Sequence, residues 1–140
     1  MDDTYAALSD SALPIIFHAG FEIRGDVCEA HPGDFITLRK RFRKLKMVLA
    51  HLGGNLMHDF VEEEVAGSDL YFDTAYVAQY ISPEQFLRIV NKHGAEKVLF
   101  ASDSPWGDIK RHIDFIVSSK LSSGQKELIF GKNATHLLNI

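Results

Sequence analysis

The chain has 140 residues, of which 46% are hydrophobic and 24% are charged. This balance is typical of one ordinary globular domain and excludes a disordered or low-complexity chain. The net charge of −4 gives no general attraction to phosphate backbones or anionic lipid, which argues against nucleic acid and membrane partners.

Targeting and redox signals both point to the cytoplasm. The start Met1-Asp2-Asp3 is acidic and lacks a basic leader. No apolar stretch approaches the roughly 20 residues needed to span a bilayer. The lone Cys28 cannot form an internal disulfide, and we interpret it as a loop or packing residue rather than a nucleophile.

The first predicted elements are a helix at 2–8 and a strand at 13–17 that runs into His18. Such an apolar strand without polar alternation is typical of a parallel sheet covered on both faces. The stretch 19–32 is expected to be irregular. A helix follows, with its apolar positions at helical spacing at Phe35, Leu38, Phe42 and Leu45.

Strands and helices then alternate to the end of the chain. Strands are expected at 46–51, 70–74 and 97–103, each ending beside polar or small residues. Ser82 with Gln85 predicts a capping box, and His93-Gly94 ends that helix. The remaining helices are expected around 57–67, 109–117, 125–130 and 133–138.

The strand ends His18, His51, Thr74 and Asp103 recur at close to the 30-residue period of βα units. Residues 1–140 are therefore expected to form one α/β domain with four parallel strands. A four-stranded parallel sheet leaves two open edges, which are a hazard unless covered. We expect a homo-oligomer or a missing half to cover them.

Three of these strand ends carry candidate metal ligands: His18, His51 and Asp103. In parallel α/β sheets ligands bind at the carboxyl ends of strands, so a curled sheet would bring these side chains together. Imidazole with carboxylate suits Zn²⁺ first, with Mn²⁺, Fe²⁺ and Ni²⁺ as alternatives. Each residue taken alone is better explained as a hydrogen-bonded structural histidine or a turn aspartate.

The predicted chemistry is activation of water by the cation, with Asp103 taking the proton and returning it to the leaving group. Trp106 is placed to line a small-molecule substrate pocket or to pack on the following helix, and His31 to touch substrate. The other histidines are expected at the surface or an interface: His58, His93, His112 and His136.

Four segments together resemble the carboxyl-terminal half of an amidohydrolase-2 type enzyme, a metal-dependent branch of the amidohydrolase superfamily. They are Pro14–Gly20, Leu49–Gly54, Leu70–Thr74 and Phe100–Trp106, and the ending Ile129–Ala134 is similar to the family's closing segment.

The resemblance implies half of a TIM barrel, strands five to eight followed by C-terminal helices, with the N-terminal half absent. It implies that His18 and Asp103 bind metal, that His51 binds metal or polarises the substrate, and that Asp103 also acts as base or acid. The family's His-x-His pair on the first strand has no match in this chain, so only part of the family site is expected.

Three functions compete. The leading hypothesis is a metal-dependent hydrolase of a C–N, C–O or lactone bond. The first alternative is a metal-dependent decarboxylase of a carboxylated ring or dienoate, and the second is a noncatalytic, self-associating half-barrel module. A doubly wound anion-binding domain is disfavoured because no glycine-rich phosphate loop follows the first strand.

Overall fold

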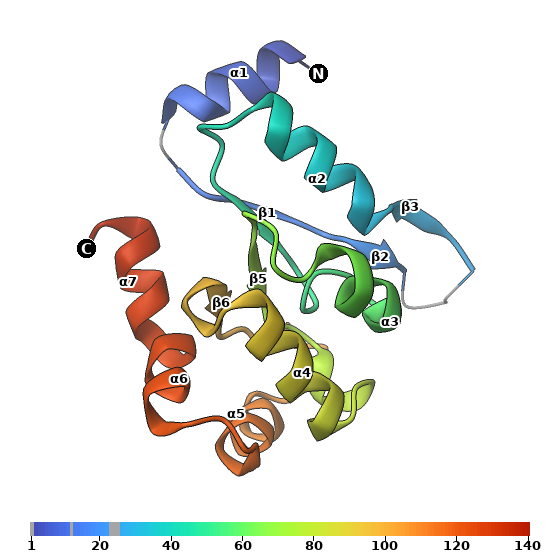
Figure 1. The fold of residues 1–140 in the computed structure, drawn as a ribbon, viewed down its shortest axis with the longest axis vertical. Helices are drawn as coiled ribbons and strands as arrows, with labels where there is room; N and C mark the ends of the chain where they lie inside the picture. Colours follow the sequence, from blue (N-terminus) through green and yellow to red (C-terminus); the bar gives the residue numbers. More distant parts are fainter. Residues whose placement is uncertain (1, 12, 23–25) are drawn as a thin grey trace.

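The computed structural model describes residues 2–11, 13–22 and 26–140, so part of the predicted irregular stretch, residues 23–25, lies outside it. Four short strands form one parallel sheet in the order β1-β4-β5-β6 (Figure 1). They are β1 (Ile15–Phe17), β4 (Met47–Leu49), β5 (Tyr71–Asp73) and β6 (Val98–Leu99). The predicted α/β class and parallel topology are confirmed.

Helices connect the strands and cover one face of the sheet (Figure 1). The longer helices are α1 (Asp2–Ser11), α2 (Pro32–Arg41), α4 (Pro83–His93) and α5 (Ile109–Ser118). The shorter turns are α3 (His58–Phe60), η1 (Val61–Val65), η2 (Val77–Gln79) and η3 (Ala95–Lys97). The chain closes with α6 (Ser123–Glu127), η4 (Leu128–Lys132) and α7 (Asn133–Leu138), which are consecutive where two separate helices were predicted.

The predicted irregular stretch contains a small antiparallel hairpin of β2 (Gly20–Phe21) and β3 (Cys28–Ala30). Such short strands carry no readable period. A bridge from Gly20 to Asn55 attaches the hairpin to the loop after β4. That contact spans more than thirty residues, so sequence spacing could not reveal it.

The core lies between the sheet and the helices. Met47 and Leu49 of β4, Phe72 of β5 and Val98 of β6 point to this side and are buried. Side chains alternate along a strand, so Ile16 of β1 points to the opposite face, where it is 67% exposed. The sheet is therefore only partly covered on the face away from the helices.

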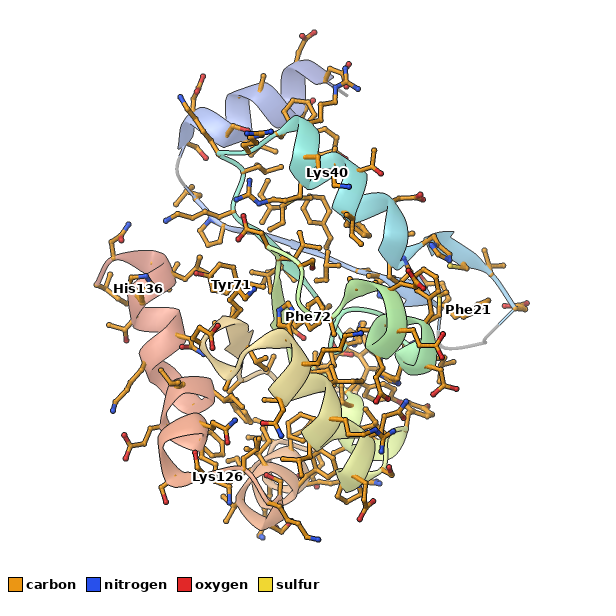
Figure 2. The ribbon with its side chains drawn as sticks, in the orientation of Figure 1. Phe21, Lys40, Tyr71, Phe72, Lys126 and His136 are labelled. Carbon is orange, nitrogen blue, oxygen red and sulfur yellow. The ribbon has the colours of Figure 1, made fainter. Side chains whose placement is uncertain are left out.

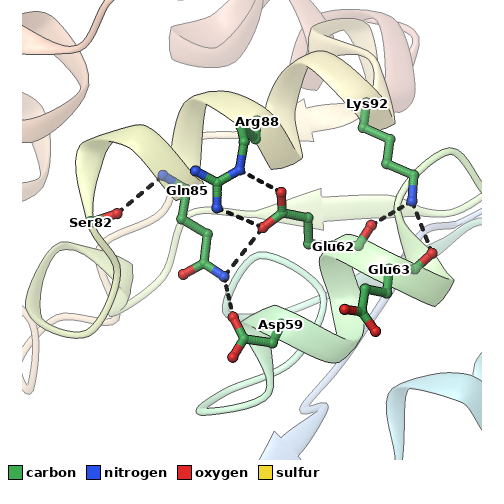
Figure 3. Close-up of polar contacts among 7 residues, drawn as sticks. All are labelled: Asp59, Glu62, Glu63, Ser82, Gln85, Arg88 and Lys92. Carbon is green, nitrogen blue, oxygen red and sulfur yellow. Dashed lines mark hydrogen bonds and ion pairs between the residues drawn. The ribbon is translucent and has the colours of Figure 1, made fainter.

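A polar network joins η1 to α4 at the surface (Figure 3). The Arg88 guanidinium donates to both carboxylate oxygens of Glu62, at 2.6 and 3.1 Å, and lowers the pKa of that carboxyl. The Ser82 hydroxyl accepts from the Gln85 amide as predicted, but the Gln85 side chain donates to Asp59 instead of completing the capping box. Because solvent screens exposed pairs of this kind, each contributes little to stability.

Three histidines predicted at the surface are buried, with exposed fractions of 7% for His58, 2% for His93 and 1% for His112. Each of the three donates a ring N–H to a backbone carbonyl oxygen, and His136 alone of the four is exposed as expected. His93 follows Ile89 and Val90 by one helical turn, so it lies on the buried face of α4. The prediction of surface positions was wrong because histidine was counted as polar, although a neutral imidazole with its hydrogen bonds satisfied can be buried beside apolar residues.

Acid should destabilise the fold through His93. Its ring stacks on Phe72 with centroids 3.7 Å apart, and both nitrogens are engaged, by Gly67 N–H and by Leu70 O. Burial, with the nearby Lys97 charge, lowers the pKa of His93 from 6.5 to about 4. The unfolded chain therefore binds this proton first, and stability should fall by about 3 kcal/mol as the pH drops from 6.5 to 4.

Urea unfolding at a series of pH values would measure this loss. His93→Gln is the matched control, because its carboxamide can accept from Gly67 and donate to Leu70 but does not titrate. We expect a shallower pH dependence in this variant. An unchanged slope would assign the acid sensitivity to other groups.

Candidate active site

Unfavourable backbone conformations concentrate at the carboxyl ends of the strands. His51 after β4, Tyr76 after β5 and Asp103 after β6 have φ values of 61°, 60° and 64°. A non-glycine residue with positive φ is uncommon and costs about 1–3 kcal/mol, and such residues cluster at functional sites. The sheet edge predicted to bind a ligand is thus also where the chain holds strained residues.

Two predicted site residues meet at this edge. The Nδ1 atom of His18 lies 3.1 Å from Nε2 of His51, and the ring centroids are 5.0 Å apart. His51 is buried and His18 is half-buried. The parallel pairing of β1 with β4 brings these strand ends together, in the register Phe17 to Leu49.

The tautomer of His51 follows from its surroundings. Its Nδ1 atom lies 3.0 Å from the carbonyl oxygen of Ala75, which can only accept, so Nδ1 carries the proton. The Nε2 atom then presents its lone pair to His18. This arrangement, in which a second group fixes the ring, is typical of metal-binding histidines.

The geometry of the pair fits one divalent cation. Two nitrogens bound to the same zinc ion at 2.0–2.1 Å lie roughly 2.8–3.4 Å apart for bond angles between 90° and tetrahedral. Without a cation, His18 donates through Nδ1, and its buried Nε2 has no hydrogen-bond partner among the residues that the structure describes. With a cation between the rings, Nε2 would carry the proton and face the Glu22 carboxylate, 3.7 Å away.

Asp103 does not join this pair within the described part of the chain. There, no group of three or more histidine, cysteine or acidic side chains is arranged to hold a metal ion. Asp103 follows β6, two strands from β4 and three from β1 in the sheet order. Strands are spaced about 4.8 Å apart, so the outer strand ends converge only if a sheet closes into a barrel.

Asp103 instead lies near a second acidic group, Asp73. Burial raises the pKa of the Asp73 carboxyl, and the negative charge of Asp103 contributes to the shift. The pKa of Tyr76 is raised chiefly by its hydrogen bond with the Tyr80 hydroxyl. The negative charge of Asp103 makes a smaller contribution in the same direction. Thr74 joins the neighbouring strand ends, since its hydroxyl bonds both the amide and the carbonyl of Ala101 at 2.9 Å.

The predicted substrate residues have different surroundings. Trp106 is 69% exposed, so most of its side chain faces solvent rather than packing on α5. His31 caps α2, with its Nδ1 accepting from the Gly33 amide at 3.2 Å and its ring edge against Phe60. The structure gives His31 a local structural role, and substrate contact by either residue stays a prediction.

Sequence reasoning gave no role to Asp73 or Tyr76. Asp73 ends an apolar strand in the same way as His18 and Asp103, so the signal was available and was not used. Tyr76 had no such signal, because its left-handed conformation depends on the loop that follows β5.

A family model described as amidohydrolase matches residues 1–140. The chain belongs to the amidohydrolase family. The predicted resemblance is therefore confirmed. A search of proteins with curated functions found no match for this amidohydrolase chain.

Solved structures with the same fold include an uncharacterized TIM-barrel protein from Bordetella bronchiseptica, with a TM-score of 0.77 and 18% identity over 99% of this chain and 50% of that one. A 2,6-dihydroxybenzoate decarboxylase from Rhizobium has a TM-score of 0.74 and 12% identity, over 98% of this chain and 54% of that one. A dihydroxybenzoic acid decarboxylase from Polaromonas sp. JS666, with bound manganese and an inhibitor, has a TM-score of 0.69 and 14% identity, over 98% of this chain and 53% of that one.

This amidohydrolase chain thus has the arrangement of a half TIM barrel and spans about half the length of the structures it matches. Among the residues described, every helix is too short or too polar to cross a membrane.

Proposed function

We propose that this chain forms the carboxyl-terminal half of a metal-dependent hydrolase that cleaves a C–N, C–O or lactone bond in a small molecule. The observation that carries the proposal is the His18–His51 pair, with its nitrogens 3.1 Å apart and the His51 proton fixed on Nδ1. Zn²⁺ is the first choice of cation, with Mn²⁺, Fe²⁺ and Ni²⁺ as alternatives.

The residues of this chain divide the work. His18 and His51 would hold the cation, which supplies Lewis-acid activation of a water molecule when bound. Once a second half closes the barrel and brings the strand ends together, Asp103 would accept the proton of the attacking water and return it to the leaving group. A hollow of about 430 Å³ beside the segment that follows the His51 loop is large enough for a small molecule, although His18, His51 and Asp103 do not line it. Its lining residues are Phe21, Leu56, Met57, His58, Asp59, Phe60, Tyr80 and Gln85.

The rest of the barrel is proposed to come from a second half that supplies strands one to four. In the edge strand β1 the side chain of Ile16 is 67% exposed, and Leu13 just before it is 64% exposed. At the other edge of the sheet, next to β6, the backbone amide of Phe100 donates to the carbonyl of Ile129 in η4, so this edge is partly covered by the chain itself. A partner half would cover β1 and bring further ligands to the histidine pair, and pairing of two copies is the alternative.

Decarboxylation of a carboxylated ring or dienoate is the second candidate, favoured by the decarboxylases among the structural neighbours. Both reactions place a cation beside a carboxylate that moves a proton. They differ in product, since only decarboxylation releases carbon dioxide.

The test uses the chain extended at its amino terminus by four (β/α) units, loaded with Zn²⁺ or Mn²⁺ and assayed on ester, lactone, amide and aromatic acid panels. We expect bound metal and a loss of about 100-fold or more in turnover for Asp103→Asn. Asp108→Asn is the matched control in the same loop, because it only caps α5.

Carbon dioxide release without hydrolysis would select the decarboxylase. A well-folded extended protein that neither binds metal nor loses turnover with Asp103→Asn would overturn the proposal and favour the noncatalytic module.

A further inference from the structure

His51 is held at its backbone amide by a buried carboxylate. The Oδ1 atom of Asp73 accepts from the His51 amide at 3.0 Å and from the Ala75 amide at 2.9 Å. Asp73 is 5% exposed and lies in β5, directly beside β4. One oxygen thus connects the ends of two neighbouring strands.

The same carboxylate also controls the ring of His51. Asp73 holds the Ala75 amide and so fixes the position of Ala75 in the loop after β5. The carbonyl of Ala75 in turn accepts a hydrogen bond from His51 Nδ1 at 3.0 Å. The opposite end of the residue is held as well, since His58 Nε2 donates to the His51 carbonyl at 3.2 Å. His51 is therefore bonded through its amide, its carbonyl and its ring.

This bonding explains how His51 keeps a positive φ of 61° without being glycine. Such a conformation persists only when the surroundings over-determine it. We propose that Asp73 is a positioning residue that sets both the backbone and the tautomer of His51, with His58 as the second anchor. The assignment rests on the proposed function in that His51 Nε2 is the atom aimed at the cation.

The test compares three variants of the 140-residue chain without metal, at about pH 8, where ordinary histidines are neutral. Long-range ¹H–¹⁵N spectra of the imidazoles report which nitrogen carries the proton. We expect His51 to be protonated at Nδ1 in the parent chain and in Asp73→Asn, whose carboxamide oxygen can accept both amides. In Asp73→Ala we expect a mixture of the two tautomers.

Asn133→Ala is the control for a merely structural effect. Asn133 is also buried and holds two backbone carbonyls, of Ala95 and Val98, at 2.7 Å. It should lower the melting temperature without moving the His51 signals. If Asp73→Ala does not fold, Asp73→Ser replaces it, because a single short hydroxyl cannot hold both amides.

Titration with Zn²⁺ separates this inference from the proposed function. We expect binding 10–100-fold weaker after Asp73→Ala, with Asp73→Asn and Asn133→Ala close to the parent. Failure of every chain to bind Zn²⁺ would count against the metal function, while the tautomer comparison would still decide the role of Asp73. An unchanged His51 tautomer in the folded Asp73→Ala or Asp73→Ser chain would overturn the inference.

Discussion

Replacing Phe72 with alanine is expected to remove about 3–5 kcal/mol of stability, a large part of the 5–15 kcal/mol typical of a domain. Phe72 lies in the middle of the molecule (Figure 2), is fully buried, and stacks on His93. Its ring also fills the space beside Gly53, where an added Cβ would lie 2.8 Å from it. Truncation would leave a cavity between β5 and α4.

Urea unfolding followed by circular dichroism measures this effect. Trp106→Ala is the control, because that aromatic side chain is 69% exposed and should change stability by no more than about 0.5 kcal/mol. Similar losses in the two variants would show that Phe72 does not anchor the core.

Gly20→Ala is expected to cost about 3 kcal/mol through two separate effects. Gly20 has φ of 94°, which an alanine adopts only with strain. Its new Cβ would also lie 2.3 Å from the carbonyl oxygen of Asn55, an atom held by the Phe21 amide. The contact is with backbone atoms, which cannot change rotamer to relieve the overlap. The β2–β3 hairpin must therefore move away from the loop after β4.

Gly124→Ala provides the matched comparison, since within the described part of the chain the added Cβ meets no atom of another segment within 4 Å, and the position is inside α6. Alanine favours a helix by up to about 1 kcal/mol over glycine, so this variant should be as stable as the parent or more so. Thermal unfolding of both variants checks the pair. Equal melting temperatures would contradict the close approach at Gly20.

Most of the architecture could be predicted because it is encoded locally. Apolar runs such as Met47–Leu49 identify buried parallel strands, and Ser82 with Pro83 marks the start of α4. The spacing of strand ends gave the four βα units. Each of these signals lies within one element, where hydrogen-bond geometry and side-chain period act over a few residues.

The candidate site was predictable only in part. The sequence placed His18 and His51 at adjacent strand ends, and neighbouring parallel strands bring such residues together. Asp103 was expected to join them, but it follows β6, and an open sheet does not bring that strand end to the pair. Convergence of all three depends on barrel closure, which four strands cannot complete.

The sequence by itself determined the order, type and direction of the four parallel strands and of the main helices between them, and the family to which the chain belongs. Only the tertiary structure decided that His58 and His93 are buried, that Asp73 holds His51, and that Gly20 touches Asn55. The physical reason is the distance along the chain over which each signal acts. Periodicity within one element shows only which face of that element is apolar. Hydrogen bonds between residues twenty or more positions apart are fixed by how the packed elements meet.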